Sequence, residues 1–100
     1  MSAHGTALMR QLCEIAEAPC VPVAHEHPWA SCTFEGARHF IALMFSGPHA
    51  IAAAERILTG LEDREFKLER AFVADIGPAG AFAWDGCAGV KIEALVIDSC

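Results

Sequence analysis

Two histidines and two cysteines in the first third of the chain form its most suggestive pattern for chemistry. The spacing C-x4-H-x-H-x4-C is made by Cys20, His25, His27 and Cys32. Side chains two residues apart in an extended segment point the same way, so the two imidazoles could share a cation, and thiolates would favour zinc. Because none of the usual structural zinc spacings is present, we expect neither a metal nor another cofactor. The alternatives are a metal-binding protein that uses the His25/His27 loop, and a pH-sensitive loop.

Nucleophilic catalysis has weaker support in the sequence. A cysteine nucleophile needs a histidine base and a group that orients the histidine. Cys32 and His39 are expected on one face of a hairpin but not opposite each other, and Cys87 has no obvious partner. No GxSxG motif marks a serine nucleophile, and the helix start SGPHA lacks the glycine-rich loop and the lysine of a phosphate site. The sequence therefore identifies no catalytic residue and favours a non-catalytic protein.

Composition excludes several classes of partner. The chain has 100 residues, of which 54% are apolar and 20% are charged, and its net charge is −6. This length suits one domain over residues 1–100, in which we expect residues 1–5 to be disordered. The acidic balance argues against nucleic acid and against an anionic membrane surface, because both attract basic residues. The sequence contains no run of about 18 apolar residues, so it predicts no membrane-spanning helix.

Cysteine usage indicates the compartment. The chain has five cysteines, an odd number, with no CxxC pair among them. The stretch MSAHGTALMRQLCEIAEA lacks the basic start and the unbroken apolar run of a secretory signal. We therefore predict a cytoplasmic protein with reduced thiols, most of which act as small apolar side chains.

Two segments have helical patterns that could support a site. In residues 6–18, Leu8, Leu12 and Ile15 repeat on one side, and Pro19 ends the pattern. In residues 48–59, apolar residues again repeat at helical spacing, and Gly60 suits the position just past the helix end. Both helices are therefore expected to cover a sheet with one apolar side.

Four further segments are expected to be strands. Residues 29–35 and 38–46 flank Gly36-Ala37, which suits a two-residue hairpin turn. The preceding proline-rich stretch, residues 18–29, is extended but cannot be a central strand. Residues 68–76 and 90–98 form the second pair, and residues 77–89 either extend this hairpin up to the turn signal Asp85-Gly86 or form a loop.

The order of these elements is helix, hairpin, helix, hairpin. It predicts an α+β, two-layer sandwich of αββαββ order, with an antiparallel-rich four-stranded sheet and both helices on one face. This topology resembles a circularly permuted ferredoxin-like domain. The second strand of each hairpin should be central, and we expect these two central strands to be mutually parallel. The predicted core consists of Leu8, Leu12, Ile15, Phe34, Ile41, Leu43, Ile51, Ile57, Leu58, Ile92 and Val96.

The uncovered side of the sheet is the predicted functional surface. An exposed apolar patch of several hundred Å² usually marks an interface or a ligand groove. We therefore expect a non-catalytic homodimer that binds a partner copy or a small ligand through this face, and a small enzyme with its site on the same face is the alternative. A ligand would bind near the two charged residues of the face. The expected face residues are Trp29, Phe40, Met44, Lys91, Glu93, Leu95 and Ile97, with Ser31, Thr33 and Ala42 between them.

Overall fold

The computed structural model describes residues 2–99, which form two α-helices, one 3-10 turn and four β-strands. In chain order these are α1 (Ala3–Ala16), β1 (Val21–Ala30), β2 (Glu35–Ser46), α2 (Ala50–Leu58), η1 (Leu61–Asp63), β3 (Ala71–Trp84) and β4 (Cys87–Asp98).

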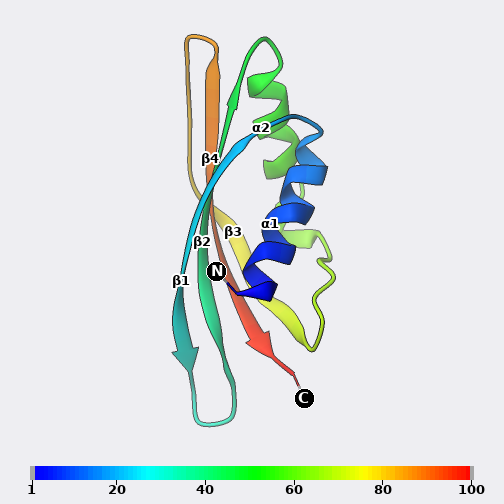
Figure 1. The fold of residues 1–100 in the computed structure, drawn as a ribbon, viewed down its shortest axis with the longest axis vertical. Coiled ribbons are helices and arrows are strands. Elements are labelled where there is room, and N and C mark those ends of the chain that lie inside the picture. Colours follow the sequence, from blue (N-terminus) through cyan, green and yellow to red (C-terminus); the bar gives the residue numbers. More distant parts are fainter. Residues whose placement is uncertain (1, 100) are drawn as a thin grey trace.

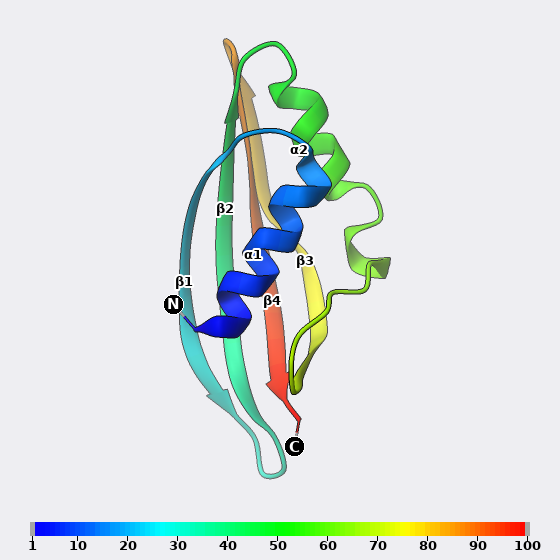
Figure 2. The same cartoon turned by 45° about the vertical axis from the view of Figure 1, so that its right-hand side comes forward.

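The four strands form one sheet with the order β1-β2-β4-β3, and every neighbouring pair is antiparallel. Both helices lie on the same side of this sheet (Figures 1 and 2). The predicted α+β fold, with a four-stranded antiparallel-rich sheet and both helices on one face, is confirmed in these features, and the sheet is antiparallel throughout. The long strands give the molecule extents of 46 × 20 × 20 Å.

The two central strands, β2 and β4, are the second strands of the two hairpins, as expected. They run antiparallel, however, and the prediction that they would be parallel was wrong. The path of the chain gives the reason. α2 and the segment after it lead the chain back to the end of the sheet where β2 began, so β3 runs in the direction of β2 (Figure 1). The tight turn after β3 then reverses the direction of β4.

The first hairpin differs from its prediction in register. β1 spans the proline-containing stretch Val21–Ala30, and the turn lies at residues 31–34, where the Ser31 N–H donates to the Phe34 carbonyl over 2.8 Å. Gly36-Ala37 therefore lies inside β2 instead of forming the turn. Two prolines are tolerated because β1 is an edge strand. Gly36 is needed for close packing, since a Cβ there would collide with the carbonyl oxygen of Val96 on β4.

The second hairpin takes the longer of its two predicted forms. Residues 77–89 complete β3, the turn and the start of β4, so they do not form a separate loop. Trp84 pairs with Cys87 across the two-residue turn, in which Gly86 has a φ of 71°. The pairing is irregular near Pro78, as expected for a residue that lacks an N–H donor.

α1 begins earlier than expected because Ser2 caps it. The Ser2 hydroxyl accepts a hydrogen bond from the Gly5 N–H at 3.1 Å, a typical N-cap contact. Residues 2–5 thus belong to the helix and its cap, whereas the sequence predicted disorder for residues 1–5; Met1 lies outside the described residues. The helix ends at Glu17, whose φ of 54° is left-handed.

The core lies between the helices and the sheet, as predicted, with two corrections. Phe34 is 49% exposed because the register places it in the first turn. Ile51 is 57% exposed because the buried side of α2 is formed mainly by alanines and Ile57. Ile15 and Leu58 are only partly buried. The other predicted core residues are buried: Leu8, Leu12, Ile41, Leu43, Ile57, Ile92 and Val96.

Candidate functional site

The side of the sheet that faces away from the helices, here called the open face, is the candidate site; in Figure 1 it is the left-hand side of the sheet. Strand alternation and register decide which side chains lie on it. Phe40 pairs with Glu93, for example, and Ala42 pairs with Lys91. Ser31 and Thr33, which the sequence placed here, belong to the first turn instead. The structure brings together all seven main predicted residues on the open face: Trp29, Phe40, Met44, Lys91, Glu93, Leu95 and Ile97.

The open face carries most of the large apolar side chains that are exposed to solvent. Among residues 2–99, seven large hydrophobic side chains are exposed, and only Phe34 and Ile51 lie elsewhere. Such clustering is unusual on a surface that stays in water. The five on the open face are Val21, Val23, Met44, Phe72 and Trp84.

Aromatic rings are grouped in two places on this face. Phe82 and Trp84 stack with ring centroids 4.8 Å apart, and Phe82 lies over Gly89, where a Cβ would collide with its ring. In the other group, His25 stacks on Phe40 at 4.8 Å, and His27 meets Phe40 edge-on at 5.6 Å. Ring pairs at these distances interact favourably, so both groups present aromatic contact surfaces.

Apart from Trp29, sequence reasoning missed the contribution of β1 and of the end of β3. The signal in β1 was the period-two series Val21, Val23, His25, His27 and Trp29, whose members share one side of a strand. Pro22 and Pro28 lie between members of this series, and prolines disfavour strands, so the pattern was not recognised. The signal in β3 was the pair Phe82 and Trp84. The sequence did not determine the register of the second hairpin, so these two residues could not be assigned to either side of the sheet.

A groove of about 250 Å³ crosses the middle of the open face. Small residues leave this space, and the Lys91 stem passes 3.6 Å from where a Gly80 Cβ would lie. Glu93 does not line the groove, and its carboxylate pairs with the Arg38 guanidinium at 3.1 Å. Among the lysine, arginine and acidic residues of the open face, only Lys91 lines the groove. The lining residues are Val23, His25, Phe40, Ile41, Ala42, Ala79, Lys91 and Ile92.

The structure does not assemble the metal pattern of the sequence. His25 and His27 do share a side, with ring centroids 5.4 Å apart, but both rings pack against Phe40. The Cys20 sulfur lies 3.1 Å from that of Cys13, and Cys32 is exposed in the first turn. Among residues 2–99, no three histidine, cysteine or acidic side chains are grouped closely enough to hold a metal ion.

A second polar cluster, which the sequence did not reveal, surrounds the start of α1. The Ser2 N–H donates to the Glu26 carboxylate at 2.7 Å, and this bond lowers the pKa of Glu26. His39 lies beside them, 1% exposed, and burial lowers its pKa. His4 reaches Asp98 at 3.7 Å on the far side of the hollow, whose volume is about 520 Å³. Because His39 is buried on the helix side and Cys32 is exposed, these two residues cannot act as the nucleophile and base considered above.

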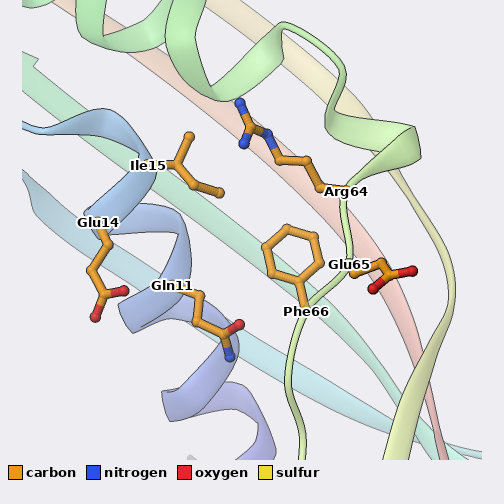
Figure 3. A pocket seen from close by; sticks show the side chains of 6 residues that line it. All are labelled: Gln11, Glu14, Ile15, Arg64, Glu65 and Phe66. Carbon is orange, nitrogen blue, oxygen red and sulfur yellow. The ribbon is translucent and has the colours of Figure 1, made fainter.

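A third hollow lies between α1 and the segment before β3 (Figure 3). The carboxylates of Glu14 and Glu65 point away from each other there, so they do not converge on a ligand. The Gln11 amide is occupied with the backbone of Lys67, which it contacts at 2.8 and 2.9 Å. Arg64 donates to the backbone carbonyls of Arg56 and Thr59. These polar groups fasten the connection to the helices, and this hollow is structural.

Comparison with known proteins does not identify the site. No protein family, curated protein or solved structure matches this chain. Within residues 2–99, no helix is long and apolar enough to cross a membrane. The open face must therefore be interpreted from its own geometry.

Proposed function

We propose that this chain is a non-catalytic binding module that acts as a homodimer, with the open faces of two copies packed together. The observation that carries the proposal is the concentration of exposed apolar side chains on this face and their scarcity elsewhere. Met, Phe and Trp are the residue types that interface cores favour. A twofold axis is the usual symmetry for two identical chains.

The size of the open face supports this assignment. Its strands have 10 to 14 residues. With a rise of about 3.3 Å per residue and about 4.8 Å between strands, four such strands cover roughly 40 × 19 Å, or about 760 Å². A stable protein interface buries about 800 Å² on each partner, so full contact between two open faces would meet this requirement.

Two charges on the open face pair with each other and suit burial, whereas Lys91 and Asp75, which lies opposite Leu95, make no ion pair within the described residues. Arg38 and Glu93 neutralise each other within one copy, which reduces the cost of covering them. Of the two unpaired charges, only Lys91 lines the groove. We therefore assign the groove beside it to a small anionic ligand with an apolar body, which would pair with Lys91 and pack against His25 and Phe40.

The two tryptophans provide a direct test, because the chain has only two and both lie on the open face. Trp84 is 58% exposed in a single copy, so a collisional quencher should reach it easily in a monomer. We expect the Stern–Volmer constant for acrylamide to be low at high protein concentration and to rise on dilution. A constant that remains high in a sample that light scattering shows to be dimeric would place the interface elsewhere.

We also propose that the fold is a circularly permuted ferredoxin-like domain and that the protein is cytoplasmic. The αββαββ order and the strand order β1-β2-β4-β3 support the first proposal. The free thiols of Cys13, Cys20, Cys32 and Cys87 support the second, because such thiols persist in a reducing compartment. Fluorescence microscopy of a tagged chain tests the location.

A further inference from the structure

Two thiols at the end of α1 lie unusually close together. The Sγ atoms of Cys13 on α1 and Cys20, just before β1, are 3.1 Å apart, and both residues are partly buried against the core. The left-handed turn at Glu17 reverses the chain and brings Cys20 back beside the helix. The segment from α1 to β1 is visible as the light blue crossing in Figure 1.

The geometry requires little change for a covalent bond. Sulfur atoms in a disulfide are about 2.05 Å apart, so these two must approach by about 1 Å. The other described cysteines lie in different places: Cys32 is exposed in the first turn, and Cys87 follows the second turn. Cys13 and Cys20 thus form the one sulfur–sulfur contact among residues 2–99.

We propose that Cys13 and Cys20 form a dithiol site that a hydroperoxide oxidises to a reversible disulfide within one chain. This inference rests on the contact between the two sulfurs, and it does not depend on the dimer proposed above. The oxidant is a hydroperoxide, and the reverse reaction uses a dithiol reductant.

The environment of the two sulfurs assigns their roles. Burial, with a contribution from Cys20, raises the pKa of the Cys13 thiol to about 12, so Cys13 keeps its proton. Cys20 therefore supplies the attacking thiolate, since only the thiolate is nucleophilic. The Cys20 thiolate attacks one peroxide oxygen and breaks the O–O bond, which gives a sulfenic acid, Cys20–SOH. With hydrogen peroxide, the other oxygen leaves as hydroxide and takes up the proton that Cys20 released, giving water.

The second step closes the disulfide. The Cys13 thiol gives up its proton to the hydroxyl group of Cys20–SOH as its sulfur attacks the Cys20 sulfur. The S–S bond forms, the S–O bond breaks, and the hydroxyl group leaves as water. With hydrogen peroxide as oxidant, two thiols and one peroxide give one disulfide and two waters. The sulfur pair loses two electrons, and the peroxide gains them.

The bond would fasten the end of α1, which a contact with α2 already anchors, to the start of β1. Arg56 on α2 donates to the Ala16 carbonyl at 2.9 Å, so the end of α1 is anchored from one side. The disulfide would anchor the same turn to the start of β1 from the other side. Oxidation should therefore make the connection between α1 and β1 more rigid.

Peptide mapping tests the proposal, because glutamates separate the cysteines. The folded wild-type chain is treated with hydrogen peroxide, its remaining thiols are blocked with N-ethylmaleimide, and it is cut after glutamate under non-reducing conditions. Cleavage at Glu14, Glu17, Glu26 and Glu35 places Cys13, Cys20 and Cys32 in different peptides. We expect the peptides of Cys13 and Cys20 to be linked, with the loss of two hydrogen atoms and of both alkylation sites. Dithiothreitol should release them.

Matched variants decide between this pair and other thiols. The exposed-cysteine control C32S should keep the linkage, and C20S should lose it while circular dichroism shows that its fold is intact. Alkylation of both Cys13 and Cys20 after peroxide treatment that oxidises Cys32 would overturn the proposal. A Cys20 that links to Cys32 or to a second chain, or that proceeds to sulfinic acid while Cys13 remains free, would also overturn it.

Discussion

His39 shows how a single residue can set the pH response of the fold. Its Nδ1 atom is buried and has no hydrogen-bond partner within residues 2–99. Burial lowers its pKa from the ordinary value of 6.5, an effect that nearby His4 strengthens and Glu26 opposes. His39 is therefore protonated less readily in the native state than in the unfolded chain. Because the unfolded chain binds more protons, stability should fall as the pH drops below about 6.5.

We predict that H39L removes most of this acid sensitivity between pH 7.5 and 5.5. Leucine has no ring nitrogen that would be buried without a hydrogen-bond partner. The stability of H39L at pH 7.5 should therefore be no more than about 1 kcal/mol below that of the wild type. Urea unfolding at both pH values measures the difference. The control H49Q changes an exposed histidine and should keep the wild-type slope. An unchanged slope in H39L would assign the acid sensitivity to other groups.

At the scale of elements, the glycine in β2 explains why the first hairpin was predicted in the wrong register. Gly36-Ala37 has the residue types of a tight turn, and β1 contains prolines that disfavour strands. Yet the need for glycine at position 36 comes from a contact with β4, more than 50 residues away. A pattern read along the chain cannot reveal such a contact. By contrast, the Asp85-Gly86 turn depends on local geometry, and the sequence predicted its position correctly.

This interpretation predicts different effects for two glycine-to-alanine changes within strands. A Cβ at Gly36 would collide with the Val96 carbonyl, so G36A should lower the free energy of unfolding by about 1–3 kcal/mol. G77A is the matched control, because a Cβ there meets no atom within 4 Å. It should change stability by less than about 1 kcal/mol. Chemical denaturation of both variants checks this, and equal losses would contradict the assigned role of Gly36.

At the scale of the whole molecule, the sequence predicted the layers better than their details. The helical repeats of Leu8 and Leu12, and the alternation of Ile41 and Leu43, were sufficient to place both helices on one side of the sheet. All seven expected residues of the open face lie on it for the same reason. The groove was only partly predicted, because its shape depends on Ala79 and Gly80 in a strand of undetermined register. The cluster around His39 was missed because its members come from four distant segments.

The central claim is that the open face is covered by a second copy of the chain, and light scattering tests it most directly. At micromolar concentration we predict that the wild type has twice the monomer mass of 10.7 kDa. V23K places a charge on the open face at a side chain that is 61% exposed in one copy, and it should give a monomer. I51K changes a side chain of similar exposure on α2, and it should remain dimeric. A monomeric wild type, or a dimer that survives V23K but not I51K, would contradict the account.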